Sequence, residues 1–119
     1  MKVEKIIEQQ KEICKKYNVD WVESSTDLKV GISKNLFSGI LPINALRHIP
    51  ENGTTGWYIW AGSYSKEDDF FDAIHLSHLT DHLEIFKYLG LPPGYRFQID
   101  NDNHEDVWFD ENILNPDNT

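Results

Sequence analysis

The chain has 119 residues, the length of a single domain, and its 39% of hydrophobic and 13% of aromatic residues exclude a disordered chain. Its 20 Asp and Glu residues outnumber its 11 Lys and Arg residues, for a formal net charge of −9. Nucleic acids and anionic membranes both attract basic surfaces, so this balance argues against either as a direct partner.

The charge is unevenly spread along the chain. Residues 1–50 hold eight basic and six acidic residues, a net of +2, whereas residues 51–119 hold three basic and fourteen acidic residues, a net of −11. This asymmetry favours either one acidic face or a set of loops whose carboxylates are simply solvated.

Cysteine use and hydropathy indicate the compartment. Cys14 is the only cysteine, so no disulfide can form within the chain, which fits a reducing cytosol. The longest stretch without a charged residue, 52–65, is shorter than the about 20 apolar residues that a membrane span needs. The first residues mix charged and apolar side chains, unlike a signal peptide. We therefore expect a cytoplasmic protein without a membrane segment.

The N-terminal segment has the pattern of an amphipathic helix. Apolar residues recur at spacings of three, four and seven from Val3 to Tyr17, which predicts a helix over about residues 2–17. Asn18 suits a left-handed stop. Cys14 lies on the apolar face, where a core residue is expected rather than a nucleophile.

The rest of the chain alternates between strand and helix patterns. Apolar alternation predicts strands over residues 28–32 and 43–48, and an aromatic run predicts a central strand over 57–61. A capping sequence at 65–68 predicts a short helical turn, and apolar spacing predicts a second helix over 76–89 that ends at Gly90. Two further strands, 95–99 and 107–109, are expected on either side of a hairpin turn over 100–105.

These elements predict the fold class. We expect one α+β domain over residues 1–119, with a mostly antiparallel sheet of about five strands and two main helices packed on it. No linker rich in Gly or Ser divides the chain.

Three histidines are the first candidates for chemistry. His78 and His82 lie four residues apart in the predicted second helix, a spacing that can chelate a metal, and His75 lies one turn earlier. They also lie beside the apolar stripe, where histidines usually pack, and no Glu or Cys completes a ligand pattern. We therefore expect no metal and no cofactor. A small metal-assisted hydrolase or ligand binder that uses these histidines is the alternative.

The acidic segment 100–111 partly matches a calcium-binding loop. Asp100, Asp102, Asp106 and Glu111 occupy places 1, 3, 7 and 12 of such a loop. However, Glu105 stands where the loop needs Gly, and the flanks are predicted strands rather than helices, so a solvated hairpin turn is favoured over a weak cation site. The chain has no phosphate-binding glycine loop, CxxC motif or nucleophile elbow, and we do not expect an enzyme.

Aromatic and acidic residues lie together in the second half of the chain. Consecutive aromatics in a strand, such as Trp57 and Tyr58, point to opposite faces, so one of each pair faces solvent unless helices cover both faces. Exposed aromatics ringed by carboxylates favour a docking surface for a basic protein. The predicted contacts are Asp68, Asp69, Asp72, Asp100, Asp102, Glu105, Asp106, Asp110 and Glu111, with Trp60 and Trp108 as anchors.

Four segments of the chain carry a resemblance to a known family: VGISKNL at 30–36, GWYIWAG at 56–62, YLGLPPGYRF at 88–97 and EDVWFDE at 105–111. Together they resemble the bacterial immunity-protein family thirty-three, over about residues 28–114, with the N-terminal helix outside the similar region. The resemblance implies a protein that neutralises a toxin of a bacterial polymorphic toxin system, and it transfers no catalytic residue.

The resemblance and the composition together predict the function. We expect an immunity-type protein that binds a cognate toxin in the cytoplasm and blocks it by steric and electrostatic complementarity. A basic toxin such as a nuclease suits an acidic inhibitor, because opposite fields raise association rates and carboxylates can mimic phosphates. A structural module that self-associates through exposed aromatics is a further alternative, and the oligomeric state is open.

Overall fold

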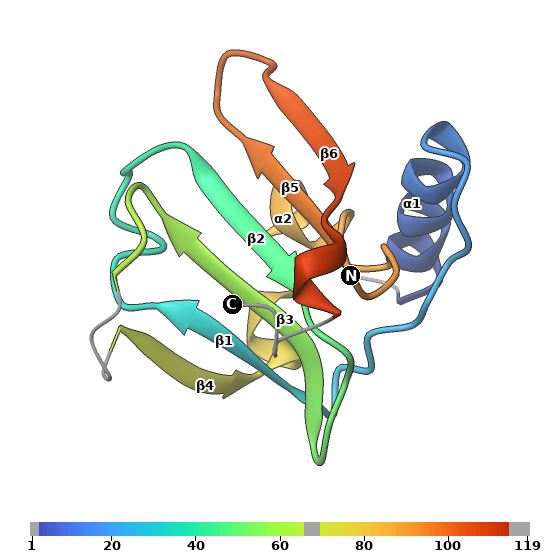
Figure 1. The fold of residues 1–119 in the computed structure, drawn as a ribbon, viewed down its shortest axis with the longest axis horizontal. Helices are drawn as coiled ribbons and strands as arrows, with labels where there is room; N and C mark the ends of the chain where they lie inside the picture. Colours follow the sequence, from blue (N-terminus) through green and yellow to red (C-terminus); the bar gives the residue numbers. More distant parts are fainter. Residues whose placement is uncertain (1–2, 66–69, 115–119) are drawn as a thin grey trace.

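The computed structural model describes residues 3–65 and 70–114, which form one six-stranded sheet with helices packed on it (Figure 1). In chain order the elements are α1 (Val3–Lys16), β1 (Lys29–Ser33), β2 (Ile43–Arg47), β3 (Thr54–Ala61), β4 (Phe71–His75), the 3₁₀ helix η1 (Leu76–Leu79), α2 (Leu83–Phe86), β5 (Tyr95–Ile99), β6 (Glu105–Phe109) and the 3₁₀ helix η2 (Glu111–Ile113).

The strand order is β4-β1-β3-β2-β5-β6. β1 pairs with β3 in parallel, and the four other neighbouring pairs are antiparallel. The predicted α+β class and the mostly antiparallel sheet are therefore confirmed, with six strands where about five were expected. The additional strand is β4, which pairs with β1 at the edge of the sheet. The predicted helical turn over 65–68 lies largely outside the described residues.

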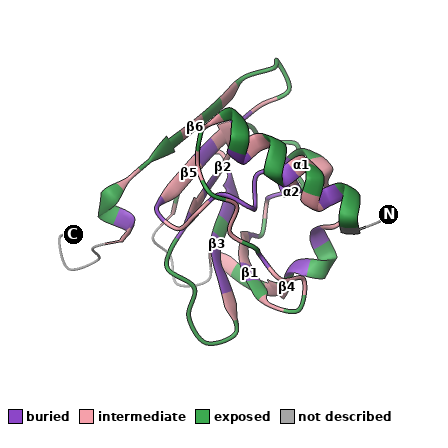
Figure 2. Cartoon of the chain, turned by 90° about the vertical axis from the view of Figure 1, so that its right-hand side faces the viewer, coloured by how far each residue is buried: buried purple, intermediate pink, exposed green. Residues whose placement is uncertain are grey.

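The two faces of the sheet differ in what covers them. Figure 2 shows α1 and α2 on one side of the sheet, with the buried residues gathered between them and the strands. The core includes Trp57 and Ile59 of β3 and Phe97 of β5, packed with leucines of the segment 76–91. On the opposite side, which we call the open face, the described residues place only η2 and no longer helix.

α1 is held to the core along one stripe. Ile6, Gln10 and Cys14 are buried at a spacing of four residues, as the predicted helix requires. The Gln10 side chain donates a hydrogen bond to the carbonyl of Phe86 (3.0 Å), and the Cys14 thiol donates one to the carbonyl of Gly90 (3.3 Å). Beyond the helix Asn18 is left-handed, with φ 57°, so the predicted helix stop is confirmed.

The predicted second helix over 76–89 is wrong as a continuous element. Its apolar residues are buried as expected, but η1 and α2 are separate short helices. Five of the six residues from Ser77 to His82 are polar and have weak helix propensity, in part because Ser, Thr and Asp side chains compete with the backbone for hydrogen bonds. Accordingly the Thr80 hydroxyl donates to the Ser77 carbonyl (3.1 Å), and the His82 amide bonds to Leu79, three residues back (2.9 Å).

Candidate partner-binding face

The strand register places one row of residues across the whole open face. Directly paired residues of neighbouring strands share a face of the sheet. The row that passes through the middle of β3 consists of Trp108, Arg96, Leu46, Tyr58, Gly31 and Ala73. The next row contains Asp106, Gln98, Asn44 and Trp60. The open face therefore has a polar half on β5 and β6 and an apolar half on β2, β3, β1 and β4.

The apolar half carries a cluster of rings, the aromatic cluster: Tyr58, Trp60, Tyr64, Phe70 and Phe71. The ring centroids of Tyr58 and Phe71 are 5.2 Å apart, and those of Trp60 and Tyr64 are 5.4 Å apart, both in edge-to-face geometry. Tyr64 is 56% exposed and Tyr58 38% exposed, whereas Trp60 lies beneath them at 4%. Tyr58 and Tyr64, rather than the predicted anchor Trp60, are the most exposed rings of the cluster.

Three hollows adjoin at Tyr58, which lines all of them. They have volumes of about 400 Å³ toward His48 and η2, about 280 Å³ toward Trp60 and Tyr64, and about 190 Å³ toward Gly31 and β4. Gly31 allows this arrangement, because a Cβ atom there would lie 2.7 Å from Cδ1 of the Tyr58 ring. The ring therefore rests on the bare backbone of β1, as a ridge between concave surfaces.

The predicted contact residues differ in their surroundings: some lie outside the described residues, some are exposed to solvent, and some are bonded to neighbouring parts of the chain. Asp68 and Asp69 lie outside the described residues. Asp72 on β4, Asp102 at the tip of the β5–β6 hairpin, Asp106 on β6 and Glu111 on η2 are exposed. Trp108 is 37% exposed on the open face, with the Arg96 guanidinium 5.5 Å from its ring centroid.

Two other predicted contacts support local structure. The carboxylate of Asp100 accepts hydrogen bonds from the amides of Asp102 (2.8 Å) and His104 (3.2 Å), so it organises the hairpin turn, whose predicted position is confirmed. Asp110 accepts a bond from the Asn112 amide (3.1 Å) at the start of η2 and forms an ion pair with Arg96 (3.1 Å).

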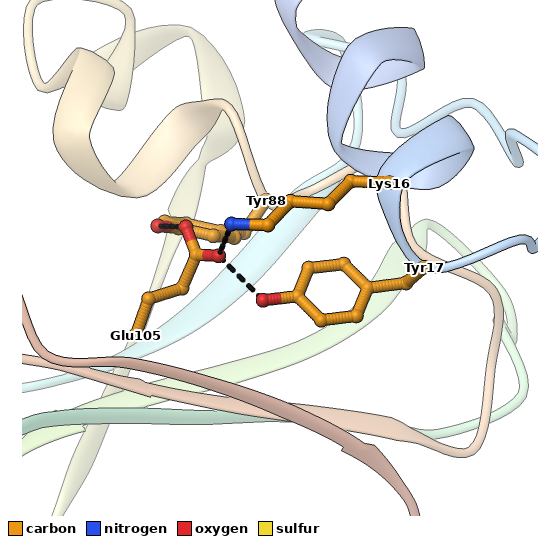
Figure 3. A network of polar contacts seen from close by, with 4 residues as sticks. All are labelled: Lys16, Tyr17, Tyr88 and Glu105. Atoms are coloured by element: carbon orange, nitrogen blue, oxygen red, sulfur yellow. Dashed lines mark hydrogen bonds and ion pairs between the residues drawn. The ribbon is translucent and has the colours of Figure 1, made fainter.

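Glu105 faces the helices instead of solvent, and Figure 3 shows the network around it. One carboxylate oxygen accepts hydrogen bonds from the Lys16 ammonium (2.5 Å) and the Tyr17 hydroxyl, and the other accepts one from the Tyr88 hydroxyl (2.5 Å). Burial alone would raise the pKa of Glu105, but these three donors outweigh it and lower the pKa to about 2. The network fastens the end of α1 to β6.

Replacing Glu105 should make the stability of the fold less dependent on pH. The folded-state pKa of about 2 lies below the ordinary value of about 4.3, so the stabilisation is present above that value and is lost as the pH falls toward 2. Glu105→Gln is expected to lower the free energy of unfolding at pH 7 by ~2 kcal/mol, after allowance for partial solvent exposure. Urea denaturation at several pH values measures both effects.

Asp102→Asn is the matched control, since it removes the same charge from the exposed tip of the hairpin. Its stability curve should run parallel to that of the wild type between pH 5 and about 2. A Glu105→Gln curve that also runs parallel to the wild type would show that the network does not stabilise the ionised carboxylate.

The three histidines do not share a helix face, because the continuous helix that would align them is not formed. The rings of His75 and His78 are 6.4 Å apart, and the His82 ring stacks on Phe37 with centroids 4.1 Å apart. His82 also lies 3.5 Å from the Glu84 carboxylate. Within residues 3–65 and 70–114, no group of three or more His, Cys, Asp or Glu side chains could hold a metal ion.

The described part of the chain also contains no helix that is long and apolar enough to cross a membrane. Residues 9–110 match the family model of the Imm33-like domain. The chain belongs to this family. No curated protein and no solved structure matches it.

The family match confirms the resemblance found in the sequence and extends it. It begins at residue 9, inside α1, whereas the resemblance covered only residues 28–114. The structure gives a reason for this earlier boundary, because Gln10 and Cys14 bond directly to the segment around α2. The second half of α1 is therefore part of the Imm33-like domain.

Proposed function

We propose that this Imm33-like domain is an immunity protein that binds a cognate bacterial toxin and neutralises it by covering a surface that the toxin needs. The observation that carries the proposal is the open face of the sheet, which holds partly exposed aromatic rings and on which residues 3–65 and 70–114 place no helix longer than η2. Large exposed aromatic patches are typical of protein-binding surfaces. Family membership supports the same conclusion.

The net charge supports a basic toxin, such as a nuclease. A formal charge of −9 attracts a cationic partner and accelerates its association, while it repels nucleic acid. The proposed mechanism is occlusion without catalysis: the toxin is bound in the cytoplasm, and its active site or substrate surface is covered.

Co-expression tests this function. The wild-type chain is expected to restore growth to cells that express the toxin encoded beside it, and to form a complex with that toxin that elutes as one species in size-exclusion chromatography. Electrostatic steering should make the association rate fall at least about tenfold between 50 mM and 500 mM salt. An unrelated toxin is the control, and growth that is not restored would contradict the proposal.

A further inference from the structure

The open face contains a preformed anchor site at Tyr58. Its ring is held from three sides: it rests on the backbone of Gly31, its centroid lies 5.2 Å from that of Phe71, and the His48 ring lies 5.5 Å away. Ring contacts of this kind fix the side-chain rotamer before binding, so little conformational entropy remains to be lost. A large, preordered and 38% exposed aromatic residue has the properties of an interface hot spot.

The hollows around Tyr58 are shaped for side chains of a partner. The hollow of about 280 Å³ is lined by Leu46, Tyr58, Trp60, Tyr64 and Phe71 together with His48, so its walls are mostly apolar or aromatic. It has the volume to take a bulky apolar side chain. The hollow on the other side of Tyr58, of about 190 Å³, has walls from β1, β3 and β4. A partner that inserts apolar groups on both sides of the ring would bury it completely.

The charges near the hollows indicate the character of that partner. Glu51 lines the largest hollow, and Lys29 lines the smallest. Asp106 lies farther along the same face, and Arg96 is neutralised there by its ion pair with Asp110. Together with the net charge of −9, the carboxylates of Glu51 and Asp106 outweigh the charge of Lys29, and they suit cationic side chains around an apolar centre.

The same charges argue against other occupants. A second copy of this chain would bring its own net charge of −9 and its own rim carboxylates against this face. A nucleic acid would bring phosphates to it. A basic protein meets neither obstacle.

We propose that the toxin docks on the apolar half of the open face, with Tyr58 at the centre of the interface, through an apolar or aromatic anchor surrounded by basic residues. This inference rests on the proposed function and specifies its surface. In this arrangement the acidic β5–β6 hairpin raises the association rate with the toxin, and the aromatic cluster provides most of the affinity of the complex.

Alanine variants and calorimetry test the inference, with the toxin encoded beside this chain, inactivated at its active site, as the probe. Tyr58→Ala is expected to weaken binding at least about 30-fold, and Tyr64→Ala about tenfold. Phe37→Ala is the matched control: Phe37 is 51% exposed but stacks on His82 at the helix side, so its loss should change the affinity less than about twofold.

Gly31→Ala separates the position of the ring from its chemistry. The added methyl group must displace the Tyr58 ring from β1, because it would come within 2.7 Å of it, while every side chain of the cluster is retained. We expect binding about tenfold weaker with circular dichroism like that of the wild type. Hydrogen exchange of the wild-type complex supplies a measurement without substitutions, in which β3 and β4 should gain protection and the tip of the β5–β6 hairpin should not.

The possible failures are distinguishable. If the wild-type chain does not bind the toxin, the proposed function fails and the docking surface with it. Two results would overturn the docking surface alone, provided that the wild type binds. One is that folded Tyr58→Ala and Tyr64→Ala bind the toxin within about threefold of the wild-type affinity. The other is that the amides protected in the complex lie on the helix side of the sheet.

Discussion

Replacing Arg47 with Met is expected to destabilise the fold by about 4 kcal/mol, a large part of the 5–15 kcal/mol that holds a typical domain together. Arg47 is 1% exposed, and it satisfies four backbone carbonyls. Its guanidinium donates to the carbonyls of Thr55 (2.9 Å), Val22 (2.8 Å), Leu91 (2.8 Å) and Glu23 (3.0 Å). Met fills similar space but leaves two buried and two partly buried acceptors without this donor.

The four carbonyls belong to three parts of the chain that are distant in sequence. Val22 and Glu23 lie between α1 and β1, Thr55 lies in β3, and Leu91 lies between α2 and β5. Burial lowers the pKa of Arg47 to about 10, so the guanidinium stays charged at neutral pH and makes charge-assisted bonds. One side chain therefore joins the helix layer to the sheet.

Arg96→Met is the control for this prediction. Arg96 lies on the open face, and its ion pair with Asp110 is partly exposed, so its loss is expected to change the free energy of unfolding by no more than about 1 kcal/mol. Urea denaturation of both variants measures the difference. Equal destabilisation by the two substitutions would show that the buried bonds of Arg47 contribute no more than a surface ion pair.

The role of Arg47 could have been predicted from the alternation in β2. Ile43 and Ala45 are core positions, and Arg47 follows at the same spacing of two residues, so the pattern places its side chain on the buried face. Its acceptors could not have been predicted, because backbone carbonyls of three separate segments leave no mark in the residue pattern.

The open face likewise depends on both local and long-range features of the chain, and only the local ones can be predicted from the residue pattern. Alternation correctly indicates that Trp57 and Tyr58 point to opposite sides of β3. It does not indicate which side the helices cover, because that depends on how α1 and α2 pack on the finished sheet. Trp60 illustrates the consequence: it points to the open face, yet neighbouring rings from β4 and the segment before it bury it.

The remaining differences arise from pairings between distant segments. β4 has no clear alternation and forms because β1 offers it an edge. Glu105 belongs to a hairpin, but its ionised carboxylate is stabilised by Lys16 of α1 and by Tyr88 of the segment after α2. In the segment 76–89, the apolar spacing predicted burial correctly but could not predict that polar residues would divide the helix. Burial patterns were thus more predictable than backbone conformation.

Gly56→Ala is expected to be as damaging as the loss of Arg47, at more than about 3 kcal/mol, for a reason that lies in the backbone. Gly56 has φ +88°, and a Cβ atom there would lie 2.1 Å from the carbonyl oxygen of His48. The amide of His48 bonds to the Gly56 carbonyl (2.8 Å), so the two segments cannot separate without breaking the β2–β3 ladder. A clash with backbone leaves no flexible side chain to move aside.

Gly53→Ala provides a control in the same hairpin connection. Gly53 also has positive φ, +77°, but nothing lies within 4 Å of the position its Cβ would take. It isolates the conformational strain, expected at about 1–2 kcal/mol. The free energies of unfolding of the two variants, measured by thermal and urea denaturation, should therefore differ by the contribution of the clash. Equal destabilisation would show that β2 and β3 can separate locally at little cost.

The same comparison bears on the docking face. Gly56 lies two residues before Tyr58, and the hairpin it closes sets the register that pairs Leu46 with Tyr58. A shift of one residue would turn Tyr58 into the core and Trp57 outward. If a folded Gly56→Ala protein is recovered, it should bind the toxin more weakly than Gly53→Ala does, because the aromatic cluster depends on this register.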